Sequence, residues 1–300
     1  MSMHGIDISN HQSKMDLVAV LRQSKTDFVI VKATEGITFV DGYCENFARI
    51  TKSAHKKFGF YHFARPERNS AKAEAEFFYK HTKNYYNTGI PVLDWESSGK
   101  KNVAWAKEWL DYVYEWSGVK PVIYMSESVV NAYNWKPVAD AGYGLWVAKY
   151  RDYKTDYNYD MSTAGRAPSV KWWKFYMMWQ WTSVGRVSGY SGNLDCDIFY
   201  GDNTAWDKYA GYAEISDVGT EVESIYAYKS MLAELPILRQ GAKCNAVKLV
   251  QLVTGATVDG DFGPKTEAAV MAFEKKYGLV EDGLVDEGDW KVILDWLATV

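Results

Sequence analysis

The sequence of 300 residues is poor in cysteine and histidine and has no long apolar segment. Its three cysteines, Cys44, Cys196 and Cys244, are far apart and outside any metal-type spacing, so we expect reduced thiols that mostly serve packing. Because no apolar stretch of the secretory type is visible near the N-terminus and no segment could span a bilayer, we expect synthesis in a cytoplasm, no signal peptide and no membrane insertion. The net charge of −4 removes the general electrostatic case for nucleic acid as a partner.

Aromatic residues, in contrast, are abundant. They make up 16% of the chain, with 13 Trp, 22 Tyr and 12 Phe. Aromatic side chains fill cores, but Trp and Tyr also line binding surfaces, where an apolar ring and a polar group are both useful. The hydrophobic fraction of 47% and the charged fraction of 24% are ordinary for a globular protein, so composition alone is compatible with both uses.

Strand-like apolar runs alternate with helical patterns over the first 200 residues. Predicted strands cover residues 4–9, 28–36, 58–66, 91–97, 120–128, 143–150, 172–182 and 193–201. Predicted helices cover residues 15–24, 45–59, 70–85 and 103–118. Gly59 would cap the second helix and Gly118 the fourth. Repeated β-then-α units predict a parallel sheet, and this many predict an α/β protein built as an irregular β/α barrel, with about five β/α units followed by closure through strands alone.

A short acidic motif, PVLDWES at residues 91–97, places Asp94 and Glu96 at the end of a predicted buried strand. Residues two apart on a strand project from the same face, so the two carboxyl groups should enter the same space. Two carboxylates held close cannot both ionise freely, and the pKa of one rises. An acid with a raised pKa beside an ionised neighbour is what glycosidic bond cleavage requires. The alternative is that Glu96 is an ordinary acid of a solvated loop.

Other acids also fall at or near the ends of predicted strands: Asp7, Glu35 and Asp195. In β/α barrels, chemistry takes place at the C-terminal ends of the strands. We therefore expect these side chains and the Asp94/Glu96 pair to gather at one end of the barrel.

The composition changes after the barrel. We predict a barrel domain over residues 1–209, a linker over residues 210–234 and a small all-α domain over residues 235–300. In the last segment Val270, Phe273 and Tyr277 form an inward helical stripe. Gly278 closes that helix.

The C-terminal segment has no basic excess. Residues 236–300 contain 7 Lys and Arg against 10 Asp and Glu. Charge alone therefore cannot attach it to a polyanionic surface, and any recognition must be specific.

Several motifs, taken in order, resemble glycoside hydrolase family 25, the lysozymes (N-acetylmuramidases) of bacteria, fungi and phages. They are HGIDIS, FVIVKATEG, GFYHFARP, PVLDWES and WQWTSVGRVSGYSGNLDCDIF, within residues 3–200. LRQG, VKLVQ, VDGDFGPKTEAAVMAFEKKYGL and EDGLVDEGDW are similar to a small helical peptidoglycan-binding domain. The combination resembles a phage endolysin, which implies a family 25-like catalytic barrel over residues 1–209, bacterial peptidoglycan as partner, and action at the cell wall after release from the host cytoplasm.

The resemblance assigns catalytic carboxylates to four positions. Asp7 matches the acid of the opening motif, Asp94 and Glu96 match the strand-end pair, and Asp195 matches the closing motif. The resemblance implies Glu96 as general acid and Asp94 as second carboxylate, which would orient the N-acetyl group of the substrate in a retaining reaction; water activation with inversion is the competing role. Asp7 and Asp195 would support the pair. Asp197 lies two residues after Asp195 and can share its face, so either can point inward, although Asp195 aligns better.

Aromatic residues near the predicted barrel mouth are candidates for substrate binding. We favour Phe63, Tyr124 and Trp146 as sugar-facing and include Tyr61 and Trp179, although alternation along the strands permits only some of them to face the groove. Glu35 either hydrogen-bonds sugar or caps a turn.

No cofactor is expected. His4 and His11 could bind a metal in principle, but no third ligand lies at useful spacing, so we predict no metal site.

Two other functions use the same C-terminal domain. One is a peptidoglycan amidase or peptidase, which needs an open metal site or a Cys/His pair. The other is a non-catalytic cell-wall-binding protein that uses the barrel as a platform for sugar. The sequence does not indicate the oligomeric state.

Overall fold

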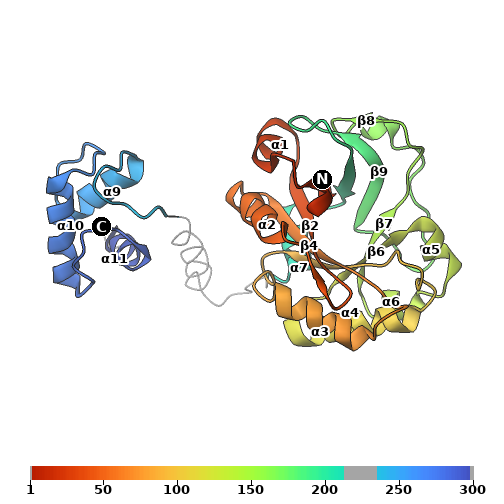
Figure 1. The fold of residues 1–300 in the computed structure, drawn as a ribbon. Coiled ribbons are helices and arrows are strands. Elements are labelled where there is room, and N and C mark those ends of the chain that lie inside the picture. Colours follow the sequence, from red (N-terminus) through yellow and green to blue (C-terminus); the bar gives the residue numbers. More distant parts are fainter. Residues whose placement is uncertain (1, 213–234, 298–300) are drawn as a thin grey trace. The chain divides into compact units, whose positions relative to one another are not determined.

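The computed structural model describes residues 2–212 and 235–297, and the chain divides into two compact units, residues 1–214 and 215–300 (Figure 1). Each unit has its own hydrophobic core and is described by itself. No helix within the described ranges is long and apolar enough to cross a membrane. The predicted domain limits stay predictions, because the predicted linker, residues 210–234, lies almost entirely outside the described residues.

Eight strands of the first unit close into a barrel in the order β1, β10, β9, β7, β6, β5, β4 and β2, with β2 pairing back to β1. Their bounds are β1 Met3–Ile8, β2 Phe28–Glu35, β4 Lys57–Phe63, β5 Ile90–Asp94, β6 Val122–Ser126, β7 Gly144–Ala148, β9 Met178–Arg186 and β10 Leu194–Phe199. β10 runs antiparallel to β1 and β9, and the other neighbours are parallel. Two short strands, β3 Phe39–Val40 and β8 Asp156–Tyr157, extend the sheet beside β2 and β9. The C-terminal ends of seven strands and the N-terminal end of β10 therefore meet at one end of the barrel.

Helices α1 to α6 lie around the barrel (Figure 1). The helices of this unit are α1 Leu17–Gln23, α2 Cys44–Ser53, α3 Ala71–Thr82, α4 Val103–Ser117, α5 Glu127–Ala132, α6 Lys136–Asp140 and α7 Asn203–Ala210, with 3-10 turns η1 Asn10–Gln12 and η2 Met161–Thr163. Local sequence sets several helix ends. The Ser70 side chain accepts a hydrogen bond from the Ala73 N–H at the start of α3, and Gly118 closes α4 in the left-handed conformation.

The predicted order of about five β/α units followed by closure through strands is confirmed. β1, β2, β4, β5 and β6 are each followed by at least one helix before the next strand of the barrel, whereas β7, β9 and β10 succeed one another without an intervening α-helix.

Gly59 corrects the predicted end of the second helix. α2 ends at Ser53, and the residue with positive φ just after it is His55. Gly59 instead lies inside β4, where an added Cβ would stand 3.0 Å from Ile30 Cγ1. The glycine serves close packing inside the barrel. The strand predicted for residues 172–182 also begins later, at Met178.

Helix α7, which the sequence analysis did not predict, closes the N-terminal end of the barrel. Its Trp206 is fully buried, with ring centroids 4.7 Å from Phe28 and 5.1 Å from Phe199. Inward residues such as Ile30 and Val92 complete this interior core. The opposite end of the barrel is therefore the end available for a site.

The second unit is helical, as predicted, with α9 Asn245–Thr254, α10 Pro264–Tyr277 and α11 Glu287–Leu297. Val270 and Phe273 are buried in its core, and Gly278 ends α10 in the left-handed conformation. The prediction that Tyr277 points inward is wrong. Tyr277 is 39% exposed, because it lies at the end of α10, where its ring is 4.6 Å from that of Phe273 between centroids.

Candidate active site

A cavity of about 290 Å³ opens at the end of the barrel where the parallel strands finish. Asp7 and Asp94 lie at or next to the C-terminal ends of β1 and β5, and Asp195 lies next to the N-terminal end of the antiparallel β10. The cavity is lined by Asp7, Ile8, Ser9, His11, Gln12, Lys32, Tyr61, Phe63, Asp94, Glu96, Tyr124, Trp146, Tyr150, Gln180 and Asp195. The topology thus brings together all four acids that the sequence analysis singled out as catalytic.

The position of Trp95 explains why the side chains of Asp94 and Glu96 point toward the cavity. Its backbone N–H donates to the Tyr124 carbonyl oxygen at 2.9 Å, so pairing with β6 continues past the last residue of β5. Its indole is buried and packs against Trp105, at 5.4 Å between ring centroids. Because Trp95 packs into the core outside the barrel, the acids on either side of it turn toward the cavity, as alternation predicts.

Asp94 lies deeper than Glu96. Asp94 is buried, and its Oδ1 atom has no hydrogen-bond partner among the described residues. Burial, and then the charges of Glu96 and Asp7, raise the pKa of the Asp94 carboxyl well above its ordinary range. The Asp94 carboxyl therefore holds its proton to higher pH than an exposed aspartate does.

Glu96 stands at the mouth of the cavity with its side chain open to solvent. The cavity walls still withdraw its carboxyl group from water enough to raise its pKa, against the opposing charges of Lys100, Lys32 and Arg65. The sequence predicts that crowding raises the pKa of one acid of the pair, and the structure assigns this contribution, after that of burial, to the deeper Asp94. Because the two carboxyls interact, apparent pKa values of activity would belong to the pair.

Gln180 connects the acid of β1 with two tyrosines. Its Nε2 donates to Asp7 Oδ2 at 2.6 Å, and its Oε1 accepts from Tyr124 Oη at 2.7 Å and from Tyr150 Oη. Burial, and then the charge of Asp195, raise the pKa of Asp7 well above its ordinary range. The network fixes the wall of the cavity between β1, β6 and β9.

Trp179 is a wrong prediction, and its correction explains why sequence reasoning missed Gln180. Trp179 is buried in the core outside the barrel, where its indole N–H donates to the Lys149 carbonyl oxygen at 2.8 Å. Gln180 takes the inward position on β9. The signal was present, because a glutamine between Trp179 and Trp181 on a strand must face the side opposite to both.

Glu35 lies outside the cavity lining but next to it, so its predicted role in sugar binding stays a prediction. Its Oε1 accepts from Arg65 Nε at 2.9 Å, and its Oε2 accepts from Lys32 Nζ at 2.6 Å. Although burial opposes them, these hydrogen bonds lower the pKa of Glu35. Glu35 thus holds Lys32, whose ammonium group lies 5.0 Å from the ring centroid of Phe63. Lys32 lines the cavity, and the sequence analysis did not predict it.

Asp195 and Asp197 both face the interior of the barrel, at different depths. Asp195 lines the cavity, where burial and then the charge of Glu96 raise its pKa to about 6. Asp197 is fully buried, and its Oδ1 accepts from Trp146 Nε1 at 3.0 Å. The structure therefore resolves the alternative that the sequence left open, with Asp195 as the acid that lines the cavity.

Four of the predicted aromatic residues line the cavity. Tyr124 and Trp146 are buried at its floor, with ring centroids 4.6 Å apart. Tyr61 and Phe63 are half-buried and more accessible. The cavity therefore presents flat apolar rings next to carboxyl groups.

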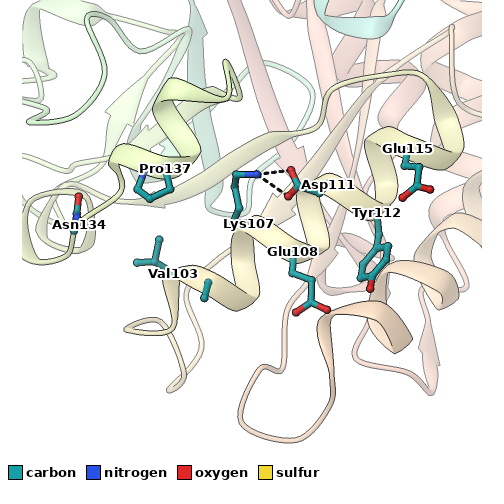
Figure 2. Close-up of a pocket in the computed structure, with 9 residues that line it drawn as sticks. Val103, Lys107, Glu108, Asp111, Tyr112, Glu115, Asn134 and Pro137 are labelled. Atoms are coloured by element: carbon teal, nitrogen blue, oxygen red, sulfur yellow. Dashed lines mark hydrogen bonds and ion pairs between the residues drawn. The ribbon is translucent and has the colours of Figure 1, made fainter.

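A larger groove of about 560 Å³ lies on the outer side of α4, next to α6 (Figure 2). Its Asp111 accepts two hydrogen bonds from Lys107, at 2.8 and 2.6 Å, and one from the Tyr143 hydroxyl at 2.7 Å. This groove contains none of the residues predicted as catalytic or substrate-binding.

Carboxyl groups and aromatic rings at the C-terminal end of an irregular β/α barrel form a site suited to the hydrolysis of glycosidic bonds. The family model described as glycosyl hydrolases family 25 matches residues 6–190, and the model described as putative peptidoglycan binding domain matches residues 248–293. The chain belongs to glycosyl hydrolases family 25 and is a glycoside hydrolase of the type that acts on peptidoglycan.

Individual relatives agree with this assignment. The chain is similar to the autolytic lysozyme of Clostridium acetobutylicum, with 28% identity over 281 residues that cover 92% of this chain and 74% of that protein. It is similar to an N,O-diacetylmuramidase of Arthroderma benhamiae, with 34% identity over 42% of this chain and 58% of that protein. The structure of the lysozyme from Streptomyces coelicolor matches with a TM-score of 0.60 and 25% identity, covering 70% of this chain and 98% of that one. The CTP1L endolysin matches with a TM-score of 0.55 and 26% identity, covering 76% and 79%.

Proposed function

We propose that the protein is an endolysin-type lysozyme that hydrolyses the β-1,4 bond between N-acetylmuramic acid and N-acetylglucosamine in bacterial peptidoglycan. The observation that carries the proposal is the pair of Asp94 and Glu96 in one cavity, both with a raised pKa, beside Asp7 and Asp195. Cleavage requires a proton for the leaving oxygen and stabilisation of positive charge at the sugar ring. Glu96 supplies the proton, because it is the acid of the pair at the mouth of the cavity.

Asp94 acts as the second carboxylate when the coupled pair holds a single proton, with that proton on Glu96 and Asp94 ionised. From its deeper position Asp94 orients the N-acetyl group of the substrate. In a retaining reaction, the carbonyl oxygen of this group attacks the anomeric carbon on the face opposite the leaving group. Asp195 supports the pair by adding negative charge near the developing oxocarbenium ion, and Asp7 supports it by holding Gln180 in the wall of the cavity. Tyr61, Phe63, Tyr124 and Trp146 provide apolar surface against the sugar rings.

The products formed from purified peptidoglycan show which bond the protein cleaves. We expect muramic acid at the newly formed reducing ends, because the acids should break the bond between C1 of N-acetylmuramic acid and the bridging oxygen. Borohydride reduction followed by amino-sugar analysis measures this, and EDTA should leave the rate unchanged. Reducing ends at glucosamine, or release of free amino groups with loss of activity in EDTA, would contradict the proposal.

The C-terminal unit is proposed to bind the cell wall and concentrate the barrel there. Deleting residues 235–300 should reduce the fraction bound in a wall-pelleting assay by about tenfold or more, since tethering a second binding module raises effective concentration. Activity on small soluble fragments should stay within about twofold, because they do not need the second module. A truncated chain that pellets with walls as well as the full chain would contradict the targeting role.

The endolysin role is supported by similarity to the lysozyme of Streptococcus phage Cp-7, with 25% identity over 57% of this chain and 49% of that protein. In that role the protein is made in the cytoplasm of an infected bacterium and reaches the wall after a separate membrane lesion. Expression in the cytoplasm should then lyse cells only when such a lesion is co-induced.

A further inference from the structure

Asp197 is a buried acid for which the proposed reaction has no direct use. It lies on β10 opposite Gly5 of β1 and Gln180 of β9, and it is 0% exposed. The titratable groups that act on it are Asp7, which faces it from β1, and Asp195 on its own strand. Its charge in turn acts on two phenols, Tyr150 and Tyr159.

Its two oxygen atoms have different partners. Oδ1 accepts from the Trp146 indole at 3.0 Å, whereas Oδ2 is buried without a donor among the described residues. The neighbouring carboxyl is that of Asp7, which lies on β1 two residues from Gly5, the residue opposite Asp197, and which accepts from Gln180, the residue opposite Asp197 on β9. Two carboxylates both accept hydrogen bonds, so a proton on one of the two carboxyls is what would give the buried Oδ2 of Asp197 a hydrogen bond. Two ionised carboxylates in contact in a buried site would also repel each other strongly.

We propose that Asp7 and Asp197 share one proton, and that this protonated pair is a positioning device that holds Asp7 against Gln180 beneath the catalytic acids. The proton would link β10 to β1, and Gln180 would carry the link to Tyr124. Burial, and then the charge of Asp7, raise the pKa of Asp197 well above its ordinary range, which agrees with a retained proton. The effect on turnover rests on the proposed function, whereas the proton itself does not.

Asp197→Asn is the matched probe, because an amide N–H can donate to an ionised Asp7 with the same net charge as the singly protonated pair but without a titratable proton. Asp197→Leu removes the donor and leaves Asp7 unpaired. A carboxyl with a raised folded-state pKa stabilises the fold below its unfolded pKa of about 4, and this stability is lost as pH rises through the folded pKa. The wild type should therefore lose Tm with rising pH faster than Asp197→Asn.

The Tm of the full chain, measured over about three pH units from pH 5 to pH 8, tests for the shared proton without an enzyme assay. We expect the Tm of Asp197→Asn, relative to the wild type, to rise by about 2–4 °C across this range. A Tm difference that stays constant with pH would overturn the shared proton, whether or not the protein is a lysozyme.

The kcat values of the Asp197 variants test the positioning role of the Asp7–Asp197 pair. On purified peptidoglycan, Asp197→Asn should keep kcat within about threefold of the wild type at the optimum pH and lose less activity on the alkaline side, whereas Asp197→Leu should lose about tenfold or more at every pH. If Asp197→Asn loses as much as Asp197→Leu, or if its pH profile coincides with that of the wild type, the positioning role is wrong.

Discussion

Replacing Glu96 by Gln should lower kcat on purified peptidoglycan by about 10²–10⁴-fold while leaving KM nearly unchanged. The amide keeps the shape and the polar contacts of the side chain but cannot donate a proton to the leaving oxygen. Because burial raises the pKa of Glu96, activity of the wild type should fall as pH rises through that pKa and the acid ionises. Release of reducing ends, followed over time at several pH values, measures both effects.

Glu108→Gln is the matched control for this substitution. Glu108 lies on α4 in the outer groove, away from the barrel mouth, so the same chemical change should leave kcat within about twofold (Figure 2). Near-normal turnover by Glu96→Gln would make the assignment of the general acid wrong.

Replacing Asp94 by Asn should lower kcat by about 10² or more. Asp94 is buried at the end of β5, next to the acid that faces the substrate, and its neutral amide cannot orient and stabilise the charged form of the substrate's N-acetyl group. The fold should tolerate the change, because Asp94 Oδ1 has no hydrogen-bond partner to lose among the described residues. Kinetics on purified peptidoglycan, with a thermal melt as the control for folding, measure the effect.

The anomeric form of the first product separates the two roles considered for Asp94. Proton NMR during early hydrolysis by the wild type should show the β-anomer, as retention requires. Early appearance of the α-anomer would instead indicate inversion, with Asp94 as the base that activates water.

Much of the barrel could be predicted from the sequence, because its order depends on local patterns. Four β/α units and a closure without helices follow from where apolar runs and helical patterns alternate, whereas α5 and α6 of the fifth unit have no predicted counterpart. Helix α7 was missed, because only the folded barrel reveals the open end that Trp206 fills. Gly59 was misread for the same reason, since its need for space comes from Ile30 on another strand.

The acids of the site could be predicted, and their supporting residues could not. Asp94 and Glu96 share a motif, so two-residue periodicity places them together. Lys32 and Gln180 reach the cavity only because β2 and β9 close the same barrel, and Glu35 is drawn away from it by Arg65. Such long-range pairs have no signature within a single stretch of sequence.

The protonation state of Glu96 tests the central claim most directly. Carbon-13 NMR of the chain labelled at glutamate side-chain carboxyls, with Glu96→Gln identifying the resonance, would give the pKa of this group. The account predicts a midpoint above the ordinary glutamate value of about 4.3, because the cavity withdraws the carboxyl from water. A midpoint at or below that value would mean that Glu96 is ionised when the reaction needs its proton, and would contradict the account.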